Sequence, residues 1–129
     1  MNGYGLLNSI ADRTRAQTFD SFLDHAREYL ASRQKNEAGV IAGVVFEDTV
    51  RRIAITHGID ESGKKLDSII SALAADGVIS GVTAKRCRAA AGVRTKATHA
   101  QWDEFDIGDV QATVAVTDEL VLVKLDGEA

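Results

Sequence analysis

Cysteine and long apolar runs are almost absent from this chain of 129 residues, and each absence narrows the class of protein. A single cysteine, Cys87, excludes an intramolecular disulfide framework and a zinc site built from several cysteines. No apolar run approaches the roughly 20 residues of a membrane-spanning helix. The N-terminal stretch lacks the charged start and the apolar centre of a signal peptide. We therefore expect a cytoplasmic protein that makes no membrane contact.

The chain also lacks proline, low-complexity segments, repeats of solenoid length and the common catalytic signatures. Gly39 and Gly43 lie within a predicted helix rather than between a strand and a helix, so they do not form a phosphate loop. No histidine and carboxylate have the spacing of a metalloprotease site, and we predict neither a metal site nor a cofactor. The length and the 45% of hydrophobic residues favour one globular domain.

Acidic residues are missing from positions 77–102, although the net charge of the chain is −4. This stretch carries five basic residues, which are Lys85, Arg86, Arg88, Arg94 and Lys96. Residues 103–129, in contrast, carry eight acids and one base. A segregated basic segment can hold a phosphate backbone locally, because salt screens charges beyond about 10 Å at 0.1 M. Equally, these bases can face solvent or pair with the acidic C-terminal segment, and the sequence leaves both hypotheses open.

Apolar residues at helical spacing predict an all-α bundle of four to five helices. The predicted helices span residues 18–30, 36–58, 64–77, 82–100 and 107–124, and the second is expected to be central and most buried. Residues 1–17 are interpreted as an N-terminal extension or short helix, and residues 18–129 as one helical domain. The last segment is ambiguous, because VQATVAV alternates like a strand. A lone strand would leave its backbone hydrogen bonds unpaired, which favours a helix.

Several residues are expected at helix ends and helix contacts. Thr18 and Asn36 are predicted N-caps, and Asp106 and Asp109 a capping-box-like pair. Two glycines are predicted helix stops, each followed by an apolar latch residue; they are Gly58 before Ile59 and Gly77 before Val78. Gly39 and Gly43 permit close approach of another helix. The fourth helix has a weak apolar line of small residues, namely Val82, Ala89, Val93, Ala97 and Ala100.

Four further residues with reactive side chains are open to a structural and a chemical interpretation. Glu47 lies in the most apolar helix, where Arg51 at i+4 can pair with it, so it is expected to lock the bundle or a dimer rather than to catalyse. His25 and His57 are interpreted as structural or solvent-facing, and His57 ends the second helix. The basic neighbours of Cys87 could lower its pKa, but a small packing residue is the better interpretation.

Arg94 and His99, in the stretch RTKATHA, form the pair with the clearest chemical potential. Imidazole can move a proton between a ribose 2′-hydroxyl, the leaving oxygen and solvent. Guanidinium can hold a phosphate through two hydrogen bonds and stabilise the charge of the transition state. A spacing of five residues places two side chains about 140° apart on a regular helix. We therefore predict an irregular helix or π-bulge near residues 94–100, or a two-fold interface there.

The motif R-T-K-A-T-H, from Arg94 to His99, resembles the signature of the HEPN superfamily (higher eukaryotes and prokaryotes nucleotide-binding domains). AGVIAGVVFEDTVRRIA is similar to the long second helix of that family, and GKKLDSIISALAADGVIS to the following shorter helix. The resemblance implies a HEPN-like bundle that dimerises and joins two R…H motifs. It implies a metal-independent endoribonuclease or RNA-binding protein in a defence or toxin–antitoxin setting, with Arg94 orienting phosphate and His99 in acid–base catalysis.

The residues around this motif complete the predicted site. We expect Thr95, Lys96, Glu47 and Arg51 to support it or contact RNA, and Lys85, Arg86 and Arg88 to form a phosphate-binding basic patch. Thr95 stands where active family members often have Asn, Asp or His. The predicted partners are a second copy of the chain, RNA or a nucleotide, and a protein antitoxin or other regulator. The alternative functions are a non-catalytic helical interaction module and a nucleotide-binding dimer.

Overall fold

The computed structural model describes residues 3–126, with side chains described for residues 10–11 and 13–125. The five α-helices are α1 (Gly3–Ala31), α2 (Lys35–Thr56), α3 (Leu66–Ala75), α4 (Gly81–Thr98) and α5 (Ile107–Leu120). A 3₁₀ turn (Trp102–Glu104) precedes α5, and a π-helical turn (Val121–Asp126) follows it. Residues 3–126 contain no strand, so the predicted all-α bundle is confirmed.

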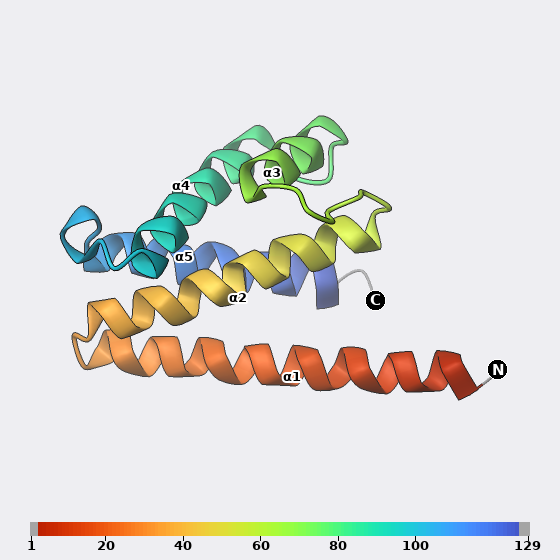
Figure 1. Ribbon diagram of the computed structural model, residues 1–129, viewed down its shortest axis with the longest axis horizontal. Helices are drawn as coiled ribbons and strands as arrows, with labels where there is room; N and C mark the ends of the chain where they lie inside the picture. Colours follow the sequence, from red (N-terminus) through yellow and green to blue (C-terminus); the bar gives the residue numbers. More distant parts are fainter. Residues whose placement is uncertain (1–2, 127–129) are drawn as a thin grey trace.

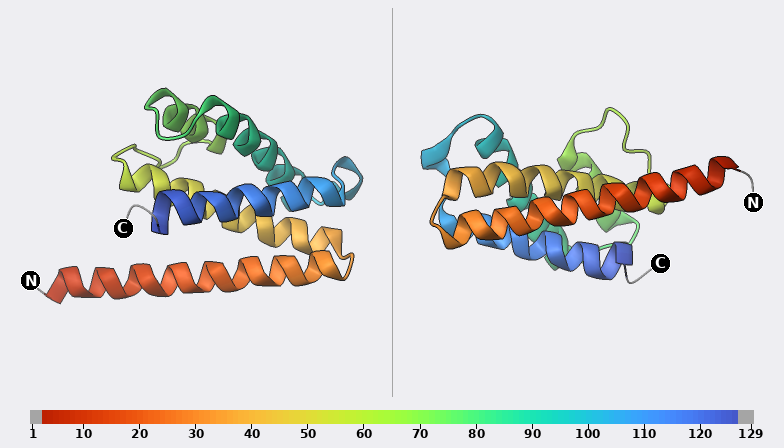
Figure 2. Two further views of the ribbon diagram at one scale, coloured as in Figure 1. Left: turned by 180° about the vertical axis from the view of Figure 1, so that it is seen from behind. Right: turned by 90° about the horizontal axis from the view of Figure 1, so that it is seen from below.

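Helix α2 is the centre of the bundle and contacts the other four helices, as predicted. α1 and α2 run side by side in opposite directions (Figure 1). α5 packs against α2 and α4 on the side away from the viewer in Figure 1, and it comes to the front when the molecule is turned (Figure 2). The short α3 lies on α4 and on the C-terminal part of α2. This arrangement leaves a cleft between α2, the start of α3 and α4.

Two groups of buried apolar side chains form the core, one along the C-terminal half of α2 and one along its N-terminal half. One group, around Phe46 and Ile53, joins α2 to α3, α4 and α5. The other, around Ala42 and Val45, joins α2 to α1 and to the N-terminal half of α5. The predicted stripe of α3 is buried; it consists of Leu66, Ile69, Ile70 and Leu73. No helix in the described part of the chain has the length and apolarity needed to cross a membrane.

The two predicted N-caps are wrong. Thr18 lies inside α1, where its hydroxyl donates to the carbonyl oxygen of Thr14 at 2.8 Å. Threonine can be accommodated within a helix through this bond to the preceding turn, so its polarity does not mark a helix start. α2 begins at Lys35 and is preceded by Gln34, so Asn36 already lies in the first turn.

The predicted helix stops and the capping box are confirmed. Gly58 and Gly77 have φ angles of 72° and 74°, which glycine adopts without the strain of a Cβ. In each case the following apolar residue donates its N–H back across the last turn of the helix. The Asp109 carboxylate accepts the Asp106 N–H at 3.0 Å, and the Asp106 carboxylate accepts the Asp109 N–H at 2.8 Å. Residues 107–120 are α-helical, so the ambiguous segment is a helix.

Gly43 allows α4 to lie unusually close to α2. A Cβ atom at Gly43 would lie 2.9 Å from the Cα of Arg94, and one at Gly39 would lie 2.9 Å from the Phe105 ring. The predicted close approach is therefore confirmed, although Gly39 receives an aromatic ring rather than a helix. The contact at Gly43 fixes where the Arg94 backbone lies and directs its side chain along α2.

The predicted apolar line of α4 is wrong in part. Val93 and Ala97 are buried, but Val82, Ala89 and Ala100 are exposed. α4 packs against α2, α3 and α5 at once, so its buried residues spread over a wide face rather than one line. They are Ala84, Cys87, Ala90, Ala91, Val93 and Ala97.

Candidate functional site

Arg94 and His99 do not meet within one chain. α4 is α-helical through Thr98, so the prediction of an irregular helix near residues 94–100 is wrong, and the π-helical turn lies at residues 121–126 instead. The alternative prediction, a two-fold interface at this stretch, stays a prediction. Arg94 turns towards α2, where its guanidinium lies 2.8 Å from Glu47 Oε1. His99 is exposed just after the end of α4. The two side chains therefore lie on different surfaces of the chain.

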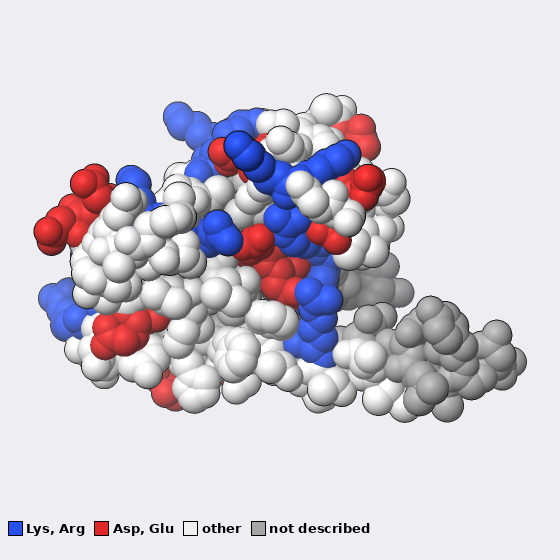
Figure 3. Space-filling view, viewed as in Figure 1, with Lys and Arg blue, Asp and Glu red and all other residues white. Residues whose placement is uncertain are grey.

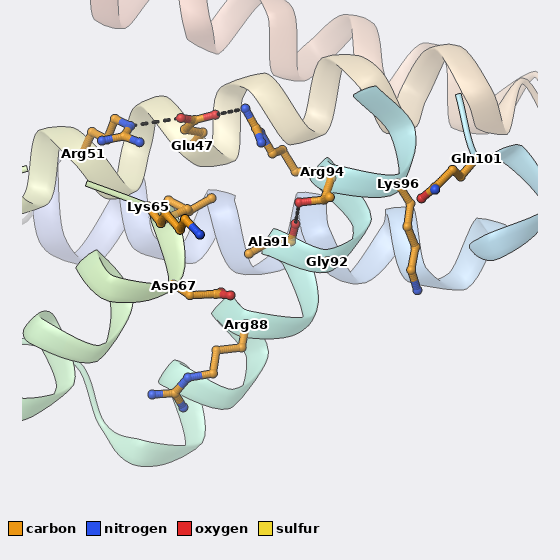
Figure 4. Close-up of a pocket in the computed structure, with 12 residues that line it drawn as sticks. Glu47, Arg51, Lys65, Asp67, Arg88, Ala91, Gly92, Arg94, Lys96 and Gln101 are labelled. Atoms are coloured by element: carbon orange, nitrogen blue, oxygen red, sulfur yellow. Dashed lines mark hydrogen bonds and ion pairs between the residues drawn. The ribbon is translucent and has the colours of Figure 1, made fainter. Parts of the chain in front are cut away.

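Arg94 lines a cleft of about 540 Å³ between α2, the start of α3, α4 and the segment after α4. We call it the cationic cleft; its lining residues are Glu47, Arg51, Lys65, Leu66, Asp67, Arg88, Ala91, Gly92, Arg94, Thr95, Lys96 and Gln101. Five of these are basic and two are acidic. The charged side chains gather where α2, α3 and α4 meet (Figures 3 and 4). The cleft therefore carries a local excess of positive charge in a protein that is acidic on average.

Glu47 joins two arginines at the wall of the cleft. Arg94 and Arg51 approach its carboxylate from opposite sides, at 2.8 and 3.0 Å (Figure 4). The predicted pair of Glu47 with Arg51 is thus confirmed, and Arg94 adds a link from α4 to α2. The prediction that Glu47 locks the bundle is consistent with this arrangement.

Arg51 is held by several acceptors at once. It also donates to the side chain and backbone oxygens of Glu61 at 2.9 and 3.0 Å and to the Lys64 carbonyl at 3.0 Å. Burial disfavours its charge, but the hydrogen bonds and charges of Glu47 and Glu61 outweigh that effect and raise the pKa of Arg51. Arg51 therefore fixes the loop between α2 and α3 and has little capacity left for a ligand.

Three other cations of the cleft are more available. Lys65 and Lys96 have no ion-pair partner among the described side chains, and Arg88 has only a 3.4 Å hydrogen bond to Ser71 Oγ. Lys65 stands at the start of α3, whose first backbone N–H groups carry partial positive charge. An oxyanion entering the cleft would meet these donors without first breaking an ion pair.

The three residues of the predicted basic patch point to different sides of α4. Arg88 lines the cleft, Lys85 is exposed elsewhere on α4, and Arg86 pairs with Glu119 of α5 at 2.6 Å. Pairing with the acidic C-terminal segment thus occurs for Arg86. Thr95 and Lys96 line the cleft as neighbours of Arg94, and the Thr95 hydroxyl donates to the Ala91 carbonyl at 3.0 Å.

His99 and His57 have the same local geometry at the ends of α4 and α2. Each follows the helix with φ −97° and ψ 13°, and each ring Nδ1 lies within hydrogen-bond distance of the carbonyl oxygen four residues back, at 2.7 and 2.9 Å. A carbonyl oxygen only accepts, so Nδ1 must carry the proton in this contact. The Nε2 atom of His99 is then the nitrogen left to exchange a proton. His25 is exposed and lies 3.6 Å from Glu28.

Cys87 is the small packing residue that the sequence favours. Its side chain is buried in the core between α3, α4 and α5. Burial raises the pKa of its thiol to about 11, against the lowering effect of Arg86 and Arg88. The basic neighbours therefore do not activate it.

Sequence reasoning missed three polar residues of the cleft: Lys65, Asp67 and Gln101. They come from the start of α3 and from the segment after α4, and only the tertiary arrangement of the helices brings them to Arg94. Sequence reasoning also missed Asp48, which is buried and paired with Arg15 and Arg52. The doubled i,i+4 spacing in EDTVRR was a usable signal for Asp48.

Among the described residues no three His, Cys, Asp or Glu side chains are placed to hold a metal ion. Comparisons of the chain with protein-family models, with curated proteins and with solved structures found no significant match.

Proposed function

We propose that the protein is a helical protein of HEPN type that binds the phosphate backbone of RNA in the cationic cleft. The observation that carries this proposal is the set of cations in the cleft that have no carboxylate partner among the described residues, foremost Lys65 and Lys96. Phosphate contacts by lysine and arginine supply most of the affinity in binding that does not depend on sequence. The resemblance of Arg94 to His99 to the HEPN motif favours RNA over other polyanions.

The geometry explains how an acidic protein could hold a polyanion. The basic side chains of the cleft come from α2, from α4 and from the start of α3, and those without an acidic partner among the described residues lie on α4 and at the start of α3. The excess acids of the C-terminal segment lie outside the cleft lining. Screening at physiological salt limits their repulsion to about 8 Å.

Measuring RNA affinity over a range of salt concentrations tests this proposal. The variant Lys65→Gln/Lys96→Gln should lower affinity about tenfold and reduce the salt slope by roughly 1.4, at about 0.7 for each lost contact to single-stranded RNA. Arg13→Gln/Lys85→Gln removes the same charge from exposed positions outside the cleft and is the matched control. Equal losses in the two variants would show that binding depends on net charge and not on the cleft.

A second candidate function, metal-independent RNA cleavage, is favoured by the orientation of His99. Its Nδ1 is engaged by the Thr95 carbonyl, which leaves Nε2 towards solvent as a proton acceptor or donor. Because His99 does not line the cleft that holds Arg94, cleavage would need the His99 of a second copy beside the Arg94 of the first. This is the composite site of a homodimer that the HEPN resemblance implies.

Complementation between two inactive variants tests the composite site. Arg94→Ala and His99→Ala should each abolish RNA cleavage in EDTA, and their mixture should recover part of it through mixed dimers. His57→Ala is the matched control, because His57 has the same end-of-helix geometry. Cleavage that survives both single substitutions, or that His57→Ala also abolishes, would refute the assignment. RNA binding without any cleavage by the wild-type protein would refute the cleavage function and support RNA binding only.

A further inference from the structure

A second pocket lies beside the cationic cleft on the same face of α2. It has a volume of about 480 Å³ and is lined by Tyr29, Asn36, Glu37, Val40, Ile41 and Trp102; we call it the aromatic pocket. Val40 in this pocket and Glu47 in the cleft are seven residues apart, which is two helical turns or about 10 Å along one helix face. The surface over α1 and the first half of α2 is largely uncharged, whereas the cleft is charged (Figure 3).

The turn after α4 connects the two sites directly. Ala100 has a φ of 57°, a left-handed conformation that is unfavourable for a residue with a Cβ. The N–H of Gln101 donates back to the Lys96 carbonyl at 2.8 Å and holds this turn. As a result Gln101 lines the cationic cleft while its neighbour Trp102 lines the aromatic pocket. One backbone step therefore separates a polar side chain in the cleft from an aromatic ring in the pocket.

The backbone at Trp102 is held in place by its surroundings. The Lys35 ammonium donates to the carbonyl oxygens of Trp102 and, at 2.8 Å, Phe105, and it lies 4.4 Å from the centre of the Phe105 ring. The Trp102 and Phe105 rings meet edge to face with centroids 6.3 Å apart. Phe105 itself is buried against Gly39. Trp102 is thus a pre-ordered wall of the pocket that remains partly exposed.

Two hydrogen-bond acceptors at the pocket have no partner among the residues that the structure describes. The side-chain oxygen of Asn36 is buried and, within the described residues, has no hydrogen bond. Glu37 is exposed and makes no ion pair with any described residue. A flat ligand that carries N–H groups can donate to the exposed Glu37 carboxylate and stack on the indole of Trp102. Nucleobases have both properties.

We propose that the aromatic pocket binds an unpaired nucleobase stacked on Trp102, while the adjoining phosphates lie in the cationic cleft. The ligand is therefore single-stranded RNA. This inference rests on the proposed RNA-binding function and adds the strandedness of the ligand to it. In a duplex the bases are paired and stacked on each other, so they cannot enter the pocket without melting. Stacking on an aromatic side chain tolerates any base, so the pocket selects for an unpaired base rather than a sequence.

Trp102 is the only tryptophan of the chain, so its fluorescence reports on this pocket alone. The titrants are a single-stranded oligoribonucleotide, the duplex of the same sequence, and inorganic polyphosphate. We expect the single strand to quench the fluorescence and to bind at least tenfold more tightly than the duplex. Polyphosphate should compete with the RNA for the cleft but leave the fluorescence unchanged.

Two variants separate stacking from charge. Trp102→Leu should weaken single-stranded RNA binding roughly tenfold or more, the range for loss of one stacked base, and leave polyphosphate affinity unchanged. Trp102→Phe should retain most of the affinity, because an aromatic face remains. Circular dichroism establishes that both variants are folded, and if Trp102→Leu is not, the wild-type fluorescence titrations decide the question.

The outcomes separate this inference from the function on which it rests. If neither RNA nor polyphosphate binds the wild-type protein, the proposed function itself fails. If both bind but the Trp102 fluorescence does not respond, or duplex and single strand bind equally, the cleft is supported and the base pocket is refuted. Quenching by an acidic amphipathic peptide but not by RNA would likewise refute it and assign the pocket to a protein partner.

Discussion

Glu47 and Asp48 are adjacent acids in α2, and each is paired with the arginine one turn later, yet they form two different clusters. The Glu47 cluster contains two acids, Glu47 and Glu61, and two arginines, Arg51 and Arg94. In the Asp48 cluster a single acid is shared by Arg15 of α1 and Arg52 of α2. The side chain of Glu47 is 24% exposed and that of Asp48 is 6% exposed.

The difference follows from the geometry of one helix. Successive residues point about 100° apart around the axis, so the same i,i+4 pairing occurs on two faces of α2. Asp48 faces α1 and helps to hold that helix on the bundle. Glu47 faces the cleft and α4, where its second partner, Arg94, is 33% exposed. The deeper cluster is thus expected to govern stability and the shallower one to govern binding.

The largest expected effect comes from removing the buried acid. Asp48→Ala leaves the Arg52 guanidinium without its carboxylate in a position that is only 19% exposed. Loss of one partner of a buried pair costs about 3–5 kcal/mol, and we expect about 2–3 kcal/mol here because Arg15 can turn to solvent. Urea unfolding followed by circular dichroism measures this loss.

Glu47→Ala is the matched change at the adjacent position. Its two arginines are 25% and 33% exposed, and Arg51 keeps its contacts with Glu61 and Lys64. We therefore expect a smaller loss of about 1 kcal/mol. Equal losses for the two alanine variants would contradict the division of roles between the clusters.

Gly43→Ala should displace Arg94 of the Glu47 cluster. The new methyl group does not contact the Asp48 cluster. The new Cβ would lie 2.9 Å from the Arg94 Cα, so α4 must move away from α2. We expect a loss of about 2 kcal/mol, within the range for overpacked cores. Gly92→Ala is the control, because a Cβ there meets no atom within 4 Å and should stabilise α4 by up to about 1 kcal/mol. If Gly43→Ala is also stabilising, the close approach does not constrain Arg94.

The bundle itself could be predicted from local patterns. The helix stops at Gly58 and Gly77 and the capping box at Asp106 are local features, and the structure has all three. The start of α1 could not be predicted from a polar residue, because Thr18 satisfies its hydroxyl inside the helix. The alanine-rich α4 was poorly predicted, since small residues carry little information about which face is buried.

The site was predictable only where its residues share a helix. Arg94, Thr95 and Lys96 are neighbours in sequence and do line one cleft, whereas the separation of His99 from Arg94 follows from the regular end of α4. Lys65 and Gln101 reach the cleft through packing between distant segments, which no spacing rule in the sequence reveals. The pairing of Arg15 with Asp48 spans 33 residues and is of the same kind.

Glu47→Gln tests whether the Glu47 cluster governs binding. Glu47 pairs with the Arg94 guanidinium, so it would compete with a phosphate that binds in the cleft as proposed. We expect its neutralisation to raise polyphosphate affinity about threefold, equivalent to about 0.7 kcal/mol. Glu61→Gln is the matched control, because Glu61 is equally exposed and pairs with Arg51 but not with Arg94. Calorimetric titration measures both, and an equal gain in the two variants would indicate a general charge effect.

The smallest expected effect is that of Arg15→Met, which tests whether both arginines of Asp48 matter equally. Arg15 is 51% exposed, so its pair with Asp48 is open to solvent at one end, whereas Arg52 is the more buried partner. We expect a loss of about 0.5 kcal/mol for Arg15→Met, which should shrink further in 1 M salt. Arg52→Met should cost more and depend less on salt. A larger loss for Arg15→Met would mean that the ion pair from α1, and not the one within α2, contributes more to the stability of the Asp48 cluster.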